Sequence, residues 1–411
     1  MALKKLNFVP GFNKQFTPSG AEGQWIDGDF VRFRSGLPEK IGGWKKLTVA
    51  QKELPGAARA QHAFTSLAGE KYTAIGTSQG LFLYYGEDFY DISPLATAIS
   101  GCTFTSTNNQ TSLTVNKTSH GLAPGRYITF SSVTLPGGGA TGFTTTELEE
   151  TTYEIISTTT NAFVITMPAV ESGTGMTAAG GATVNPYEIV GPTTQTVGYG
   201  YGTYLWGDGT WGTERTISNV TLDPGSWSLD NFGQVLVATI HNGKTFTWNA
   251  GATNPRTIRA SSNTTDYLTT NNPTASVMTL VSDRDRHLIH LGTETTIGNS
   301  STQDPMFIRF SNQEDLNSYT PTATNTAGTF RLDAGSEIRA AVNAKDYTLV
   351  LTDRAAYTMT FVGPPYTFSI RQVGTGCGCI GQHAVVYANG AVYWMGDAGG
   401  FFMYDGTVKS L

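Results

Sequence analysis

The cysteines are the first residues of this sequence that could do chemistry. Cys377-Gly-Cys379 is half of a zinc-binding motif, because thiolates at such short spacing can share one metal ion. The remaining cysteine, Cys102, lies far away in the sequence, and no histidine pair stands at the spacing typical of zinc ligands. Three cysteines do not make a disulfide scaffold. The pattern therefore favours two small buried thiols in a tight turn.

Two histidines are the next candidates. His287 and His290 lie in a strand segment that also contains Asp283, Arg284 and Asp285. This grouping could form a pH-sensitive switch or a metal site, since histidine titrates near neutral pH and is a common metal ligand. The plainer interpretation is that both are partly exposed residues at the ends of a strand.

Two neighbouring carboxylates could form an acid/base pair. Glu314 and Asp315 follow one another in Ser311-Asn-Gln-Glu-Asp315, which has the composition of a turn. Glycosidase carboxylates must converge on one bond from opposite sides, and adjacent residues on a turn are poorly placed for this. We therefore assign no catalytic role to either residue.

Common catalytic and cofactor motifs give no further candidates. We expect no nucleophile elbow, Walker loop, His-Glu-x-x-His helix or EF-hand calcium loop. The glycine repeat in Val197-Gly-Tyr-Gly-Tyr-Gly-Thr-Tyr-Leu-Trp206 lacks the strand–turn–helix context of a dinucleotide loop. We predict that the protein is not an enzyme, that it has no catalytic residues, and that it holds no cofactor or metal.

The elements that would position these residues are hairpins. Residues 347–362 and 384–404 read as two successive units of alternating apolar strands, and Asn389-Gly390 is a strong signal for a tight hairpin turn. In the second unit Val392 and Trp394 point to one face, and Tyr393 and Met395 point to the other. Because both faces are apolar, such a sheet must be covered on both sides.

Similar units recur along the chain. Hairpin patterns occupy residues 24–44, 72–92, 234–248 and 286–310, and the turns near 242, 293, 353 and 397 lie roughly 44 to 60 residues apart. Blade repeats of β-propellers have this appearance in sequence. We predict an all-β protein with a β-propeller of about six blades, counting the opening hairpin.

Composition supports this fold class. Glycine accounts for 48 of the 411 residues, and only 14% of residues are charged, as expected for an all-β chain with many tight turns. Residues 97–190 are rich in Thr, Gly and Ser and contain short alternating strands, which indicates a small antiparallel β module inserted between blades. The predicted domains are residues 1–96 (arm and first blades), 97–190 (inserted module) and 191–411 (remaining blades).

Charge is distributed unevenly. The net charge is −6, yet the first 46 residues hold eight Lys/Arg and four Asp/Glu. The mild acidic balance argues against nucleic-acid affinity across the whole surface. The arm could contact an acidic partner, although a solvated strand surface is the plainer interpretation. No signal peptide or apolar run of membrane-spanning length is expected, in keeping with a protein made in the cytosol and later assembled or released.

One long stretch and several short ones resemble a known family. The stretch is Gly20-Ala-Glu-Gly-Gln-Trp-Ile-Asp-Gly-Asp-Phe-Val-Arg-Phe-Arg-Ser-Gly-Leu-Pro-Glu-Lys-Ile-Gly-Gly-Trp44. The short ones are Arg286-His-Leu-Ile-His-Leu-Gly292, Asp304-Pro-Met-Phe-Ile-Arg-Phe-Ser311, Asn325-Thr-Ala-Gly328, Asp333-Ala-Gly-Ser336 and Phe402-Met-Tyr-Asp-Gly406. Together they resemble the tail-hub, or nozzle, proteins of short-tailed bacteriophages (podoviruses), which are also called packaged-DNA stabilisation proteins.

The resemblance implies a non-enzymatic virion protein assembled in the host cytoplasm. It implies a ring of six copies under the portal and adaptor rings, which forms the lower tail channel, retains the genome, attaches fibres or a needle, and opens for DNA ejection. Genomic DNA would pass through the lumen without sequence-specific binding, and no membrane would be contacted before infection. A lumen that does not grip phosphates suits an acidic protein. We therefore expect Arg32, Arg34, Lys40, Lys45 and Lys46 to face a neighbouring ring.

Two other functions remain open. The first is a glycan-binding, receptor-recognition tail protein. Its aromatic residues between 199 and 227 and the inserted module would form a platform for glycans, since rings on glycine-rich loops can stack on sugars or bases. Such rings more often seal the rim of a β domain. The second, a propeller glycosidase, is disfavoured because no carboxylates converge.

Overall fold

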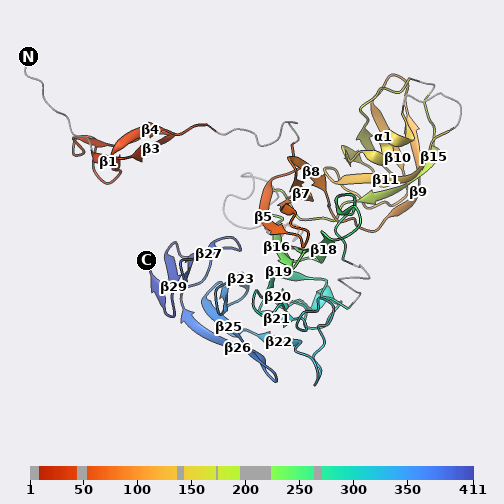
Figure 1. Ribbon diagram of the computed structural model, residues 1–411. Helices are drawn as coiled ribbons and strands as arrows, with labels where there is room; N and C mark the ends of the chain where they lie inside the picture. The colour runs from red at the N-terminus through yellow and green to blue at the C-terminus, as the bar shows by residue number, and fades with distance from the viewer. Residues whose placement is uncertain (1–8, 44–52, 137–142, 173–174, 195–223, 263–270) are drawn as a thin grey trace, which may run out of the picture. The chain divides into compact units, whose positions relative to one another are not determined.

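The computed structural model of the chain describes residues 9–43, 53–136, 143–172, 175–194, 224–262 and 271–411 (Figure 1). Contacts divide the chain into two compact units, residues 1–52 and 53–411. The described residues are nearly all strand or turn, with one short α-helix and two 3-10 turns, η1 (Pro255–Thr257) and η2 (Ser300–Thr302). No described helix has the length and apolar character needed to span a membrane.

The first unit contains two small sheets. β1 (Val9–Phe12) pairs in parallel with β2 (Gln24–Trp25), and β3 (Val31–Arg34) pairs antiparallel with β4 (Leu37–Lys40). Phe33 contacts Phe12 edge to face, with ring centroids 5.2 Å apart, and lies near Trp25. Among residues 9–43, Ala21 is the only apolar residue that is fully buried. The unit thus has a very small core.

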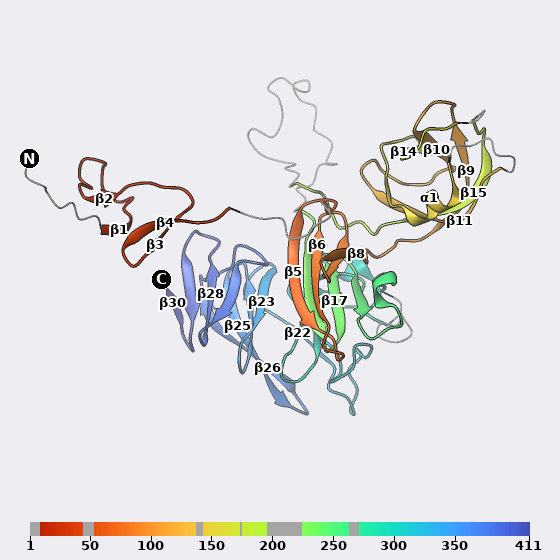
Figure 2. The same ribbon diagram turned by 45° about the horizontal axis from the view of Figure 1, so that its top comes forward.

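Five antiparallel meanders make up most of the second unit, and Figure 2 shows them from a second direction. They are numbered in chain order. Meander 1 consists of β5 (Ala58–Thr65), β6 (Lys71–Thr77), β7 (Leu81–Tyr85) and β8 (Asp88–Asp91). Meander 2 consists of β16 (Trp227–Phe232), β17 (Val235–Ile240) and β18 (Thr245–Asn249).

The other three meanders have four strands each. Meander 3 consists of β19 (Ser276–Val281), β20 (Leu288–Thr293), β21 (Phe307–Phe310) and β22 (Gly328–Arg331). Meander 4 consists of β23 (Ile338–Asn343), β24 (Thr348–Thr352), β25 (Ala355–Gly363) and β26 (Thr367–Thr375). Meander 5 consists of β27 (Val385–Ala388), β28 (Ala391–Met395), β29 (Phe401–Tyr404) and β30 (Val408–Ser410).

Consecutive meanders pack face to face. Their first strands contact one another in chain order, β5 with β16, β16 with β19, β19 with β23, and β23 with β27. Buried apolar clusters fill each space between neighbours, for example Leu351 with Trp394 between meanders 4 and 5. The middle strands are therefore buried on both faces, which explains why β17, β20 and β24 are buried along their whole length.

This arrangement is blade-like, but six blades are not confirmed. The sequence-based count included the hairpin at the start of the chain as a blade. That hairpin, β3–β4, belongs to the first unit, and within the described residues its two strands pair only with each other. Its alternating pattern resembled a blade strand because a two-stranded ribbon has the same period of two.

The segment between meanders 1 and 2 forms a sheet of its own. Its strands are ordered β12-β11-β15-β9-β10-β14-β13. They are β9 (Ile99–Ser106), β10 (Ser112–Asn116), β11 (Tyr127–Thr134), β12 (Tyr153–Glu154), β13 (Ser157–Thr158), β14 (Ala162–Thr166) and β15 (Ala179–Pro186). The sheet curls so that β12 contacts β14, and it encloses a core that includes Phe104, Phe130 and Phe163. The helix α1 (Thr145–Glu150) packs against β11 and buries Leu148.

Candidate functional site

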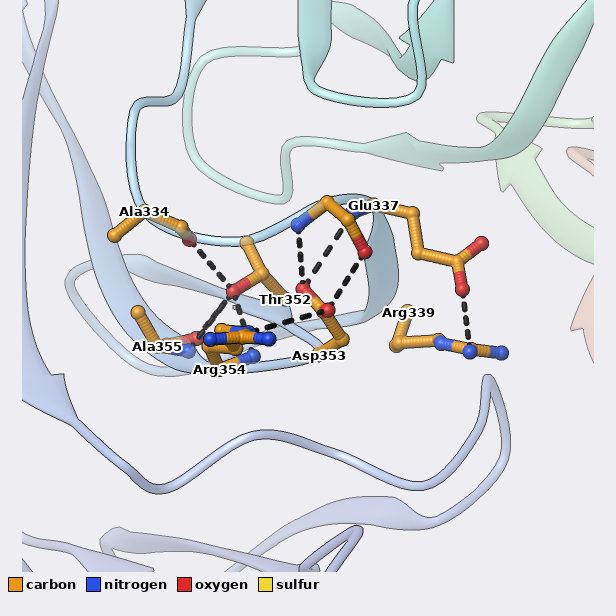
Figure 3. Close-up of polar contacts among 8 residues, drawn as sticks. Ala334, Glu337, Arg339, Thr352, Asp353, Arg354 and Ala355 are labelled. Carbon is orange, nitrogen blue, oxygen red and sulfur yellow. Dashed lines mark hydrogen bonds and ion pairs between the residues drawn. The ribbon is translucent and has the colours of Figure 1, made fainter.

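A polar corner joins the start of meander 4 to its β24–β25 turn (Figure 3). The hydroxyl of Thr352 donates to the carbonyl oxygen of Ala334 at 2.9 Å and accepts from the N–H of Ala355 at 2.9 Å. The adjacent carboxylate of Asp353 accepts from both the N–H and the hydroxyl of Ser336, each at 2.7 Å. These bonds fix the segment that leads into β23 against the turn.

The same corner occurs in meander 3. The hydroxyl of Thr293 donates to the carbonyl oxygen of Ala275 at 2.8 Å. The next residue, Glu294, accepts from the N–H of Thr274 at 2.9 Å. A threonine followed by a polar side chain therefore closes the second strand of both meanders and holds the chain that enters the first strand.

Meander 1 contains a third version of the corner, and it corrects one expectation. The sequence Gly76-Thr-Ser-Gln-Gly80 matches the letters of a nucleophile elbow, although no elbow was expected. The segment is a strand-to-strand turn between β6 and β7, so the strand–turn–helix context of an elbow is missing. Ser78 is buried and accepts from the N–H of Ala57 at 3.1 Å. The match is therefore a structural turn and not a nucleophile.

A hollow of about 520 Å³ lies beside the corner of meander 4. It is lined by Ala334, Gly335, Asp353, Arg354, Ala355, Thr375, Gly376, Gly378, Asp397, Ala398 and Phe402. Burial raises the pKa of Asp353, but the hydrogen bonds from Ser336 and from the Glu337 N–H outweigh it and hold the pKa below its ordinary value. Asp353 is therefore an ionised acceptor whose oxygens are already occupied. The lining includes a second carboxylate, Asp397, and the hydroxyl of Thr375, but no histidine, cysteine or serine.

His290 lies in the core of meander 3. Its Nδ1 is 2.9 Å from the hydroxyl of Ser276, and its Nε2 is 3.2 Å from the hydroxyl of Tyr319. Burial first, and then the positive charge of Arg309, lower the pKa of His290 to about 3. The expectation of a partly exposed residue was wrong, because apolar clusters cover this strand on both faces. Ile289 and Leu291 lie in the cluster shared with meander 4, and Leu288 lies in the cluster shared with meander 2.

His287 is also fully buried, which corrects the same expectation. Its ring is surrounded by Phe310, Phe361 and Phe368, with the centroid of Phe368 at 5.1 Å. Its Nε2 lies 3.0 Å from the hydroxyl of Thr326. Burial lowers the pKa of His287 to about 4. Both histidines are thus neutral core residues, unsuited to binding an external ligand.

Glu314 and Asp315 have separate partners. Glu314 forms an ion pair with Arg286 at 3.4 Å, and Asp315 accepts from the N–H of Asn317 at 2.8 Å. Together with Phe232 they line an open hollow of about 400 Å³. Each carboxylate is thus held by a partner of its own, and neither contact indicates the opposed pair that glycosidase chemistry requires.

The three cysteines are buried and unpaired. Burial raises the pKa of Cys102, Cys377 and Cys379, which makes the thiols poor nucleophiles and poor metal ligands. Across the described part of the chain, no group of three or more His, Cys, Asp and Glu side chains could hold a metal ion.

The aromatic stretch proposed as a glycan platform is only partly described. Residues 195–223 lie outside the described residues. Trp227, at its end, is fully buried, and its indole Nε1 donates to the carbonyl oxygen of Thr77 at 2.8 Å. It therefore seals meander 2 against meander 1 and cannot stack on a sugar.

A two-stranded neck carries the inserted sheet. Residues 94–96 and 186–188 run antiparallel, with the N–H of Ala96 donating to Pro186 at 2.8 Å and the N–H of Glu188 donating to Pro94 at 2.9 Å. Leu95 and Tyr187 face each other in this neck. The sequence signal for the neck was weak, since two three-residue segments give no periodicity.

A partly buried polar latch stabilises the neck. The hydroxyl of Tyr187 donates to Asp91, and Arg259 forms an ion pair with Asp91 at 3.1 Å. The guanidinium of Arg259 also lies 4.9 Å from the centroid of the Tyr187 ring and donates to the carbonyl oxygen of Ser93 at 3.0 Å. Burial and then the charge of Asp91 raise the pKa of Tyr187 to about 12, so the phenol remains a donor. The latch joins meander 1, the neck and the segment after β18.

The structure describes three of the five basic residues that were expected to face a neighbouring ring. Arg32 pairs with Glu39 at 3.1 Å across the β3–β4 hairpin, and both side chains are exposed. Arg34 and Lys40 lie on the same hairpin, whereas Lys45 and Lys46 fall outside the described residues. The hairpin also exposes large apolar side chains, with Phe30 65% exposed and Leu37 70% exposed. Sequence reasoning noted the charges and missed this apolar surface.

Comparisons with known proteins give only distant likenesses. No family model matches the chain, and no curated protein matches it. Among solved structures, the phage phi92 endosialidase has 13% identity and a TM-score of 0.27, over 87% of this chain and 55% of that chain. A chain from a complex of BBS1N with ARL6DN has 12% identity and a TM-score of 0.31, over 87% of this chain and 84% of that chain. The chain thus spans about half the length of the endosialidase, and both likenesses are too distant to assign a family or an activity.

Proposed function

We propose that this chain is a structural component of a bacteriophage tail, the nozzle or hub that forms the lower DNA channel. Six copies would form a ring below the portal and adaptor rings, retain the packaged genome and carry fibres or a needle. The resemblance of residues 20–44 and of the shorter segments to tail-hub proteins supports this proposal.

The observation that carries the proposal is the apolar surface of the first unit. Phe30 and Leu37 remain largely in water, and Ile26 and Ile41 are exposed as well. An apolar patch of this kind on a body with a very small core marks an interaction surface. An assembly subunit needs such a surface, whereas an isolated lectin or hydrolase does not.

The residues that carry the resemblance in meanders 3 and 4 support a structural role. Asp304 accepts from the N–H of Met306 at 2.9 Å and pairs with Arg331 at 2.6 Å. Asp333 accepts from the hydroxyl of Tyr357 at 2.6 Å. These side chains hold turns and strands in place, as expected if the shared residues preserve an architecture.

The test is to purify the full chain and to image it alone and with the portal–adaptor assembly of the same virion. We expect six-fold rings in two-dimensional class averages and no retention on a glycan array. A Phe30→Ser/Leu37→Ser variant should lose the rings, whereas Ile156→Ser, which replaces an exposed apolar residue of the inserted sheet, should keep them. A monomer that retains glycans would overturn the proposal.

The basic residues provide a second test of the same proposal. Reversing the charges of Arg32, Arg34, Lys40, Lys45 and Lys46 should weaken binding to the adaptor ring while leaving DNA binding unchanged, since rim charges act mainly on association with a charged partner. If the reversed variant assembled into tails as well as the natural chain, these residues would not face a neighbouring ring.

A further inference from the structure

The long hairpin of meander 4 projects beyond its neighbours. β25 and β26 have nine residues each, whereas the adjacent β24 has five. Both ribbon views show β26 running out to a free tip at the lower edge of the second unit (Figures 1 and 2). Between Arg354 and Arg371 the sequence contains no charged residue, so the projecting part is entirely uncharged.

The tip of this hairpin, residues 362–366, exposes apolar side chains. Val362 is 55% exposed and Tyr366 is 81% exposed, and Pro364 and Pro365 between them are also exposed. The base of the hairpin is fixed by contrast, because Phe361 and Phe368 pack against each other and against the buried ring of His287. A rigid base therefore presents an apolar tip to water.

We propose that this tip inserts into the boundary between the headgroups and the acyl chains of a lipid bilayer. Pro364 and Pro365 have no backbone N–H, which lowers the cost of moving the turn out of water. Tyr366 has the apolar ring and polar hydroxyl of residues that gather at membrane interfaces. Arg371 lies five residues further along β26, about 16 Å away along the strand, where its charge can stay among the headgroups.

The shape of the tip favours lipid over a protein partner. A stable protein complex buries about 800 Å² on each partner, and a convex turn of five residues cannot supply that area by itself. A bilayer surrounds a convex tip on all sides, so the same few side chains can be fully desolvated. One tip binds weakly, and several copies on one particle would bind far more tightly. The inference does not depend on the proposed tail function, because lipid affinity is measured on the isolated chain.

The experiment uses a fluorescent reporter on the full chain. In Tyr366→Cys, an environment-sensitive dye can be attached selectively because the three native cysteines are buried. We expect a blue shift and an increase in emission when phosphatidylcholine vesicles are added, with and without phosphatidylglycerol. The same dye on Thr407→Cys, in the exposed polar turn between β29 and β30, should not respond.

Flotation of unlabelled protein with the same vesicles supplies the second measurement. A Val362→Asp/Tyr366→Asp variant should bind about tenfold less than the natural chain, since two apolar contacts with the bilayer are replaced by charges. Tyr366→Trp should bind at least as well as the natural chain. An unresponsive dye at position 366, equal flotation of the aspartate variant, or retention of the tip by an envelope protein in the absence of lipid would each overturn the proposal.

Discussion

The indole of Trp227, on the first strand of meander 2, occupies the space beside Gly76 on the second strand of meander 1. A Cβ on Gly76 would lie 2.5 Å from Cδ1 of that indole, closer than side-chain carbons normally approach. Gly76 is therefore required for the contact between two consecutive meanders, and the requirement concerns size rather than turn geometry. The buried Trp227 in turn bonds to the backbone of Thr77.

We predict that Gly76→Ala lowers the free energy of unfolding by about 1–3 kcal/mol, because the added methyl overpacks a filled interface. Urea denaturation followed by intrinsic fluorescence measures this change. Gly381→Ala is the matched control, since a Cβ there meets no atom within 4 Å. If the two variants were equally stable, the contact between meanders 1 and 2 would accommodate the added methyl group with no loss of unfolding free energy, and Gly76 would not be required there.

The latch gives a second prediction. Removing either charge, in Asp91→Asn or Arg259→Met, leaves a partly buried partner without its ion pair, so each variant should lose about 1 kcal/mol of stability or somewhat more. The double variant should lose less than the sum, with a coupling energy of about 0.5–3 kcal/mol. Hydrogen exchange should also quicken in the neck residues 94–96 and 186–188.

The exposed pair Lys409–Asp405 is the control for this cycle, and its coupling energy should stay below about 1 kcal/mol. If the Asp91–Arg259 coupling were no larger than that of the surface pair, the latch would not be what holds the inserted sheet to meander 1.

Much of the strand pattern could be predicted from sequence because it depends on local chemistry. The Asn389-Gly390 turn is an example: both residues have positive φ, 51° and 85°, as this hairpin turn requires. One apolar face of β28 is covered as expected, with Val392 and Trp394 buried in the cluster between meanders 4 and 5. The expectation that the other face is covered too was wrong, because Tyr393 is only half-buried and Met395 is exposed on the last meander of the series. Alternation and turn residues are sufficient for such elements.

Other features depend on contacts between distant segments, and the sequence alone did not reveal them. The burial of His287 results from the packing of Phe361 and Phe368 of meander 4 on meander 3. His290 is covered instead by Tyr319 from the loop after β21, and no local pattern encodes either contact. The corners at Thr293 and Thr352 are made by common residue pairs. Their hydrogen bonds to the segment that enters the first strand can be recognised only once the strand register is known. Helix α1 was missed although its signal is present, since Thr144 and Glu147 form a capping box.

The buried histidines predict a loss of stability in mild acid. Their folded pKa values, about 4 for His287 and about 3 for His290, lie below the ordinary value near 6.5. The unfolded chain therefore binds more protons between these limits, and the free energy of unfolding falls as the pH drops below about 6.5. Each histidine contributes a slope of at most about 1.4 kcal/mol per pH unit.

Urea denaturation at a series of pH values from 7.5 to 4.5 measures this slope. His287→Phe fills the same aromatic cluster without a titrating group. The pH dependence of its free energy of unfolding should therefore correspond to one proton fewer taken up on unfolding. A His287→Phe profile that falls as steeply as that of the natural chain would mean that this histidine is not protonated on unfolding.

The polar corner of meander 4 gives the last prediction. Thr352→Val keeps the shape of the side chain but removes the hydroxyl that serves Ala334 and Ala355, so two backbone groups lose a partner and stability should fall by about 1–3 kcal/mol. Thr352→Ser keeps the hydroxyl and should retain most of that stability. Because the corner recurs, Thr293→Val in meander 3 should behave like Thr352→Val, and chemical denaturation of the three variants tests both statements. If serine were as destabilising as valine, packing of the methyl group would hold the corner, and the repeated hydrogen bonds would be a consequence of the fold and not one of its causes.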